Sequence, residues 1–232
     1  AGAVADLHVR GALDDPAALR ELAAQVDVLT FEWENVSAVA LEAAAEECPV
    51  RPSPEALHVT QHRGREKAFL AEAGLPLPRH LAVAGAADLP AAIEEVGAPC
   101  VVKTAGFGYD GKGQVVVADE GDVAAAAALA AAGPVVVEEL VDLSAELSVV
   151  VARGVTGEVA AYAPFVNRHS RHVLDVTVAP FAGGRKEWRG VGEAAAARAR
   201  ALAVAVAERL ELVGVCCVEF FLTRGGDLLV NE

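Results

Sequence analysis

The sequence contains no methionine, only four cysteines and few aromatic residues, which make up 5% of its 232 positions. Cys48, Cys100 and the adjacent Cys216 and Cys217 follow no zinc or redox spacing, which predicts buried, reduced thiols. No apolar run reaches the roughly 18 residues that a membrane helix needs. No charged-then-apolar leader opens the chain either. We therefore expect a cytoplasmic protein with no membrane partner.

Positive charge is also scarce. Lysine and arginine total 19 against 33 aspartates and glutamates, which gives a formal net charge of −14. A nucleic-acid surface needs clustered basic side chains that displace counterions, so we expect no nucleic-acid partner. A bound nucleotide is compatible with this balance, because local positive charge and backbone amides can hold phosphates inside an acidic protein.

What is present predicts a globular fold in two parts. Asp15–Pro16 predicts the capped start of a helix, residues 26–31 a strand, and residues 37–47 a second helix. This alternation is typical of the tail of an α/β unit. The prolines in 51–54 predict a domain boundary. Because an apolar run leads directly into the final Asn231–Glu232, we expect the chain to be a segment of a longer protein.

Helices and hairpins are mixed after that boundary, which predicts an α+β fold for the larger part. Helices are expected at 65–73, 88–97, 122–133 and 193–210. Strands are expected at 99–103, 114–118, 135–139, 146–153, 158–165, 173–179, 213–222 and 228–232.

A glycine-rich loop joins two of these strands, in the string KTAGFGYDGKGQ from Lys103 to Gln114. It matches GxGxxG and GxxxxGK, but both motifs must open a helix, and a P-loop also needs Ser or Thr after its lysine. Here Gly113 follows Lys112, and a strand comes next. A glycine hairpin can fold over phosphates because no Cβ blocks its amides. A flexible turn is the alternative, and the two bracketing lysines favour the phosphate flap.

A second candidate site lies in the last predicted hairpin. If its turn is centred near Gly225, Glu219 lies opposite Asn231 or Glu232, with Cβ atoms roughly 4.5–5.5 Å apart. Two carboxylates and an amide oxygen suit Mg²⁺, which completes its shell with water and phosphate. The alternative is that Glu219 faces solvent on a half-exposed strand.

Several strings resemble the N5-carboxyaminoimidazole ribonucleotide synthases of the ATP-grasp superfamily. They are TFEWENV (30–36), Gln61-x-Arg63-x-x-x-Lys67, VVKTAGFGYDGKGQ (101–114), VVVEELVDLSAELSVVVAR (135–153), Asn167-x-His169 and GVCCVEFF…LLVNE (214–232). His62 stands where that family commonly has aspartate. The resemblance implies the end of a Rossmann-like preATP-grasp domain at 1–51, then an ATP-grasp domain at 52–232. Its subdomains would cover about 76–137 and 138–232.

The resemblance also implies roles for single residues. Arg63 and Lys103 correspond to phosphate or nucleotide ligands, Glu146 to the ribose ligand, and His169 to a further nucleotide contact. The flap would comprise Gly108, Tyr109, Asp110, Gly111, Lys112, Gly113 and Gln114. Of these, Tyr109, Asp110 and Lys112 would lie near the bicarbonate and aminoimidazole site. The adenine segment would be Glu138, Glu139, Leu140 and Val141, and the magnesium ligands Glu219 and Glu232, with Asn231.

The activity implied is ATP-dependent phosphorylation of bicarbonate to carboxyphosphate, followed by carboxylation of aminoimidazole ribonucleotide, in a homodimer that uses ATP and Mg²⁺. Alternatives remain at the level of residues. His169 could be a solvated turn residue, and Glu138 and Glu139 could form an exposed acidic strand end. Trp33 and Glu34 could merely pack at a domain interface. At the level of function, the alternatives are a formate-using ribonucleotide transformylase and a non-catalytic nucleotide-binding module.

The first prediction concerns the two ends of this site. Lys103→Ala or Glu232→Ala in the complete protein should nearly abolish ATP turnover. Lys103 would offset negative charge on the transferring phosphoryl group, and Glu232 would bind the magnesium ion that also does so. Phosphate release measures this. A loss smaller than about tenfold would contradict both assignments, since one lost transition-state contact usually costs more.

Overall fold

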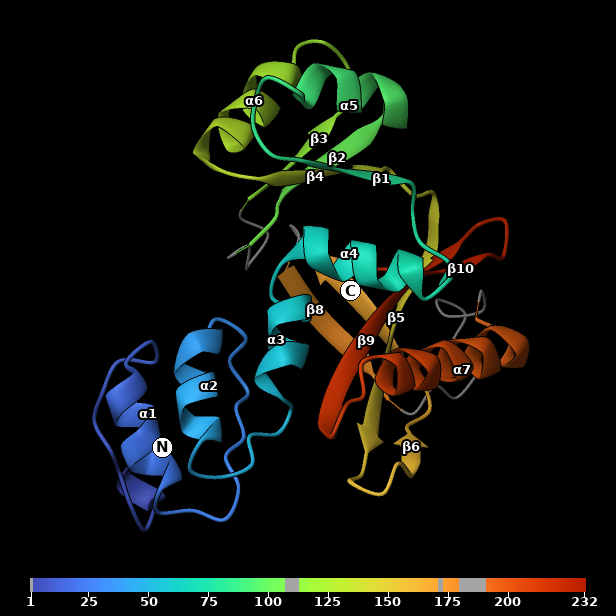
Figure 1. The fold of residues 1–232 in the computed structure, drawn as a ribbon. Helices are drawn as coiled ribbons and strands as arrows, with labels where there is room; N and C mark the ends of the chain where they lie inside the picture. Colours follow the sequence, from blue (N-terminus) through green and yellow to red (C-terminus); the bar gives the residue numbers. More distant parts are fainter. Residues whose placement is uncertain (1, 107–112, 171–172, 180–190) are drawn as a thin grey trace.

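The computed structural model describes residues 2–106, 113–170, 173–179 and 191–232 (Figure 1). The helices in these ranges are η1 (Gly2–Val4), α1 (Pro16–Ala23), α2 (Ala38–Ala45), α3 (Pro54–Thr60), α4 (Arg63–Glu72), α5 (Leu89–Val96), α6 (Val123–Ala132) and α7 (Glu193–Arg209). The strands are β1 (His80–Val83), β2 (Cys100–Thr104), β3 (Gln114–Val117), β4 (Val135–Glu139), β5 (Leu143–Arg153), β6 (Val159–Ala161), β7 (Phe165–Ser170), β8 (Val173–Val178), β9 (Gly214–Thr223) and β10 (Leu228–Val230).

The N-terminal group consists of α1, α2 and α3 around a small apolar core that includes Leu41 and Leu57. The predicted strand at residues 26–31 is wrong. Only Leu29 forms a bridge, and its partner is Val50. Val50 lies between Pro49 and Arg51–Pro52, and prolines have no N–H to extend a ladder, so the pairing stops there.

The first sheet has the order β1-β4-β2-β3, and its neighbours in this order pair antiparallel. Helices α5 and α6 cover one face (Figure 1). Side chains alternate along a strand, so Val102 and Val137 pack under these helices. The same alternation turns Lys103 and Glu138 toward the other face, which looks toward α4.

The second sheet has the order β10-β9-β5-β7-β8, with β6 paired to β5. Helix α7 packs on one face, over a core that contains Leu147, Val218 and Phe220. Glu219 and Phe221 alternate with these core residues on β9, so they point to the opposite face. Each sheet therefore presents charged or polar side chains on the face that its own helices leave uncovered.

Helix α4 lies in the middle of the molecule, between the two sheets and the N-terminal group (Figure 1). His62 is its N-cap, and Nδ1 of that imidazole accepts from Arg65 N at 3.4 Å. Burial and the nearby Arg65 lower the pKa of His62, which favours the neutral ring that can accept this bond. His62 thus performs the capping function that an aspartate at this position would perform.

The sequence predictions for the larger part hold for most elements and fail in a few. The predicted domain boundary at 51–54 contains Pro54, the first residue of α3, and this helix was not predicted. Neither β1 nor most of β7 was predicted. The single strand expected at 158–165 is two strands, because Pro164 interrupts the run between β6 and β7. The domain limits at 51 and 137 stay predictions. In the described part of the chain, no helix is both long and apolar enough to cross a bilayer.

The core under α7 can be tested at two adjacent phenylalanines. Phe220 is 1% exposed, whereas Phe221 is only half-buried. Phe220→Ala should lower the free energy of unfolding by about 3–5 kcal/mol, because it leaves a cavity in a packed core. Chemical denaturation measures this loss, and Phe221→Ala is the matched control. Equal losses in the two variants would contradict the assignment of faces on β9.

Candidate functional site

Lys103 stands at the end of β2, on the face that α5 and α6 leave uncovered. Its ammonium donates to Glu138 Oε2 at 2.9 Å. The same ammonium lies 5.8 Å from the centre of the Phe221 ring, which belongs to the second sheet. Since Phe221 and Glu219 share one face of β9, Lys103 and Glu219 face a common space between the sheets.

Glu138 is buried between two lysines. Its side chain is 1% exposed, and its other oxygen, Oε1, lies 3.6 Å from the Lys67 ammonium. Burial alone would raise the pKa of Glu138, but Lys103 and Lys67 outweigh it and hold the pKa below its usual value. The alternative that Glu138 belongs to an exposed acidic strand end is therefore wrong.

Arg63 connects the first sheet to the end of the last hairpin. Its Nη1 donates to the Thr104 carbonyl at 2.9 Å, and its backbone N–H donates to the Ala105 carbonyl. Its Nη2 lies 3.6 Å from Glu232 Oε2. A cation of α4 thus lies beside both the entrance to the glycine loop and the acidic strand end.

The last hairpin has the predicted register. Asn231 N donates to the Glu219 carbonyl at 2.8 Å, and Glu219 N donates to the Glu232 carbonyl. Burial raises the pKa of Glu219 to about 7, and the neighbouring Glu232 adds to the rise. Glu219 is only partly exposed, so the alternative of a solvent-facing residue is wrong. A carboxylate that is costly to ionise beside a second one is a suitable place for a cation.

Two acidic side chains that the sequence reasoning left without a site role join this hairpin end. Burial raises the pKa of Glu66 to about 8, with Glu232 adding to it and Lys67 and Arg63 opposing it. Burial also raises the pKa of Glu34, and Glu232 contributes. Spacing could have pointed to Glu66 and Lys67, because they follow Arg63 by three and four residues and so share its helix face.

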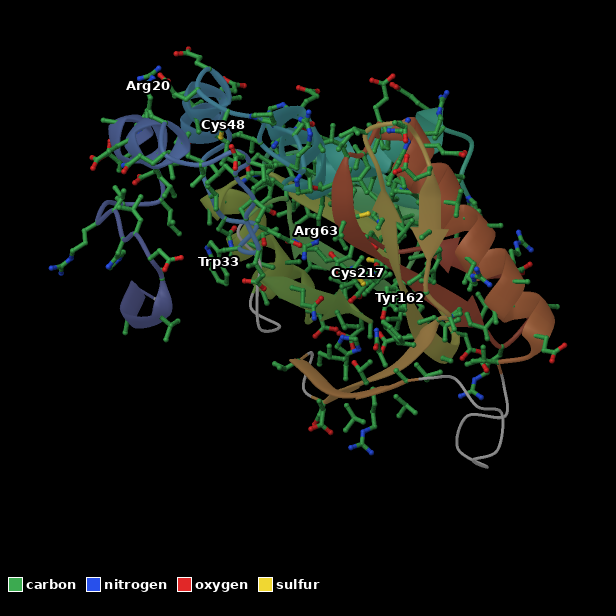
Figure 2. The ribbon with its side chains drawn as sticks, turned by 90° about the horizontal axis from the view of Figure 1, so that it is seen from below. Arg20, Trp33, Cys48, Arg63, Tyr162 and Cys217 are labelled. Carbon is green, nitrogen blue, oxygen red and sulfur yellow. The ribbon has the colours of Figure 1, made fainter. Side chains whose placement is uncertain are left out.

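Two pockets meet at Arg63 and Glu232. One of about 250 Å³ is lined by Trp33, Glu34, Glu66 and neighbouring residues, and the other, of about 700 Å³, extends past Cys217 and Glu219. Figure 2 shows Arg63 between Trp33 and Cys217. Trp33 and Glu34 therefore line the candidate site, in addition to lying where two parts of the chain meet.

Glu146 and His169 form a separate pair on the uncovered face of the second sheet. His169 Nδ1 lies 2.6 Å from Glu146 Oε2, and the two residues belong to β5 and β7. The neighbouring Asn167 donates to Ser148 and accepts from Thr177. His169 is thus a strand residue with a carboxylate partner, and the alternative of a solvated turn residue is wrong.

The structure describes only the end of the predicted flap. Gly113 has a φ of +81°, and a Cβ there would lie 2.6 Å from Thr104 Oγ1, so the position requires glycine. Gln114 pairs with Lys103 across the sheet. The other predicted flap residues lie outside the described ranges: Gly108, Tyr109, Asp110, Gly111 and Lys112.

The remaining predicted residues are the last residue of β4, Glu139, and the two residues that follow it, Leu140 and Val141. Glu139 turns away from Glu138 and pairs with Arg79. Leu140 is 45% exposed, and its N–H donates to the Pro99 carbonyl. Val141 follows it in the segment that leads into β5. Leu140 and Val141 lie in the segment that connects β4 of the first sheet to β5 of the second.

The cysteines contribute no disulfide among the described residues. Cys48 and Cys100 are buried, as predicted, and burial raises the pKa of Cys100. Cys217 is exposed on the face of β9 that carries Glu219, so the prediction of burial is wrong there. Its neighbour Cys216 packs against the core on the other face.

The architecture and the acidic hairpin end opposite Lys103 define the class of protein. The sequence model of the ATP-grasp domain matches residues 68–232, and that of the ribonucleotide synthetase preATP-grasp domain matches residues 1–61. The chain belongs to the ATP-grasp family. This confirms the expected fold, a preATP-grasp segment followed by an ATP-grasp domain.

Within that family, the resemblance to the N5-carboxyaminoimidazole ribonucleotide synthases is also confirmed. The synthase of Bacillus subtilis (strain 168) is 37% identical over 231 residues. A crystal structure of an N5-carboxyaminoimidazole ribonucleotide synthetase in complex with ADP has a TM-score of 0.91 and 35% identity. The Aspergillus clavatus synthase, in complex with ADP and 5-aminoimidazole ribonucleotide, has a TM-score of 0.88 and 27% identity.

These alignments cover nearly all of this chain but only part of each relative. They span 100% of this chain and 59% of the B. subtilis protein. The corresponding values are 100% and 59% for the ADP complex, and 99% and 58% for the A. clavatus complex. The chain therefore spans less than two thirds of the length of these relatives.

The buried carboxyl of Glu66 yields a prediction about pH. Its pKa in the folded protein, about 8, lies above the ordinary value of 4.5. Between these values the folded state keeps a proton that the unfolded state releases. This contribution to stability is therefore full below pH 4.5 and is lost as the pH rises through about 8, by at most about 1.4 kcal/mol per pH unit.

Glu66→Gln removes this titration. The free energy of unfolding of the variant should therefore rise relative to that of the parent between about pH 5 and about pH 8, the range set by the two pKa values. Urea denaturation at several pH values measures it. The control is Glu72→Gln, which changes an exposed carboxyl of the same helix. A constant difference between Glu66→Gln and the parent across the range would contradict the shift.

Proposed function

We propose that the complete protein carboxylates 5-aminoimidazole ribonucleotide to N5-carboxyaminoimidazole ribonucleotide, with ATP and bicarbonate as cosubstrates and carboxyphosphate as the intermediate. One observation carries the proposal: Lys103 of the first sheet and Glu219 of the second face the same space, with Arg63 and Glu232 beside it. The names and bound molecules of the similar synthases supply the substrates in this proposal.

On the nucleotide side, the two sheets would hold opposite parts of ATP. Lys103 and Arg63 are the described cations nearest the end of the glycine loop, and they suit the phosphates. Glu146 would accept from the ribose hydroxyls, and His169 holds that carboxylate in place at 2.6 Å. The backbone of residues 138–141, at the end of β4 and just after it, would form hydrogen bonds with adenine.

The residues of the last hairpin fit a magnesium ion. Glu219 and Glu232 supply two carboxylates and Asn231 an amide oxygen, and Mg²⁺ commonly takes one or two carboxylates plus water and phosphate. The pKa of Glu219 is raised by burial and by Glu232, and a divalent cation would offset both effects. Among the described residues no group of three or more His, Cys, Asp or Glu side chains is placed to hold a metal ion, so water and phosphate would supply the remaining ligands. Such an ion would neutralise charge on the phosphates.

The chain's own groups account for the chemistry that remains. Arg63 and Lys103 would stabilise the negative charge that develops as a phosphoryl group moves from ATP to bicarbonate. The flap, with Tyr109, Asp110 and Lys112, would exclude water from the short-lived carboxyphosphate. The pocket beside Trp33 and Glu34 opens onto Arg63 and Glu232, so it is the place where the amine substrate would meet that intermediate.

Two further proposals concern the complete protein. The first is that it is a homodimer, which rests on the resemblance alone, and the second is that it works in the cytoplasm. The two rival functions make different demands. A formate-using transformylase would replace bicarbonate by formate, and a non-catalytic module would bind ATP with no dependence on Mg²⁺.

The test is phosphate release by the complete protein, with each substrate left out in turn. We expect release that requires ATP, Mg²⁺ and bicarbonate and that rises when aminoimidazole ribonucleotide is added. Release that requires formate would favour the transformylase. ATP binding without turnover, unaffected by a metal chelator, would favour the non-catalytic module.

A further inference from the structure

The buried Lys67 lies where three elements meet, and the function proposed above gives it no part. Its Nζ donates to the Asn231 carbonyl at 2.7 Å and lies 3.6 Å from Glu138 Oε1. The side chain is 2% exposed, so it has little access to a ligand in the space between the sheets. Its contacts instead join α4 to β4 and to the chain that follows β10.

We propose that Lys67 is a positioning residue, which sets the distance between Lys103 and the acidic end of the last hairpin. It does so by holding Glu138 and the backbone of Asn231 at the same time. The inference rests on the proposed function in one respect, namely that Lys103 and Glu232 serve a nucleotide and its metal ion.

On one side of Lys67, the carboxylate of Glu138 is divided between two cations. Oε2 accepts from Lys103, whereas Oε1 has no hydrogen-bond partner among the described residues and lies 3.6 Å from the Lys67 ammonium. Since both oxygens face a lysine, the carboxylate cannot turn without weakening one of the two contacts. The orientation of Glu138, and with it the place of Lys103, therefore depends on Lys67.

On the other side, the Asn231 backbone lies between the two carboxylates of the hairpin. Asn231 N donates to the Glu219 carbonyl, and Glu232 is the next residue along the chain. A shift of Asn231 would therefore move Glu219 and Glu232 relative to each other. Groups that orient metal ligands in this way commonly change metal affinity about 10- to 100-fold when they are removed.

A buried ion pair can also be merely structural, and a change that leaves one partner unpaired destabilises the whole fold. The two roles predict different measurements. A positioning role affects the metal ion more than the nucleotide. A merely structural role lowers the melting temperature and weakens both ligands together.

The experiment measures two binding constants of the complete protein by titration calorimetry. The first is for ADP without metal, and the second is for Mg²⁺ with ADP at saturation. In Lys67→Met we expect Mg²⁺ to bind about 10- to 100-fold more weakly, whereas ADP loses less affinity than Mg²⁺ does. Arg224→Gln is the control, because it removes an exposed ion pair with Asp142 at the turn of the same hairpin. It should change neither constant.

A second comparison removes the carboxylate from both of its members. Glu138→Gln keeps the Lys67 ammonium and its contact with Asn231, whereas Lys67→Met/Glu138→Gln leaves neither member of the buried ion pair charged. We expect the double variant to bind Mg²⁺ about tenfold more weakly than Glu138→Gln, with equal ADP affinity. This comparison decides the matter if Lys67→Met does not fold.

Equal Mg²⁺ affinity in the members of either comparison would overturn the proposal. So would an equal loss for ADP and Mg²⁺ that follows the melting temperature. Because these readouts are binding constants, a failure to find bicarbonate-dependent turnover would count against the proposed function and leave this test intact.

Discussion

The site depends on one buried carboxylate, that of Glu138, which two lysines from different elements share. Lys103 belongs to β2 of the first sheet, and Lys67 belongs to α4. The Lys67 ammonium also donates to the Asn231 carbonyl at the end of the last hairpin. A charge at 1% exposure is tolerated only when it is paired. The first sheet, the central helix and the second sheet must therefore come together with the correct spacing, or that charge is left uncompensated.

The remaining charges follow from this arrangement. Arg63, one turn before Lys67 on α4, contacts Thr104 at the start of the glycine loop and Glu232 at the end of the hairpin. Around it, the acidic side chains of Glu66 and Glu219 have raised pKa values, first because they are buried and then because Glu232 is near. The protein thus gathers carboxylates and cations around one space, and a nucleotide with a divalent cation requires groups of both signs.

Local rules in the sequence predicted much of this. A hairpin turn near Gly225 predicted that Glu219 lies opposite Asn231 or Glu232, because pairing in a short hairpin is fixed by its turn, and the structure has Asn231. Alternation along β2 and β4 also turns Lys103 and Glu138 toward one face of the sheet, but the sequence reasoning did not pair these two residues. Lys67 and Glu66 received no role, because the sequence shows which residues share a helix face but not what packs against it. The strand expected at residues 26–31 failed for a related reason: its neighbour, Val50, lies between prolines that no rule applied to residues 26–31 alone would reveal.

The most direct test is a crystal structure of the complete protein with a non-hydrolysable ATP analogue and Mn²⁺, whose anomalous scattering locates the ion. The account predicts that the manganese peak lies between Glu219 and Glu232, and that the Lys103 ammonium contacts the phosphates from the opposite sheet. A nucleotide bound elsewhere, or a manganese ion remote from these two carboxylates, would contradict it.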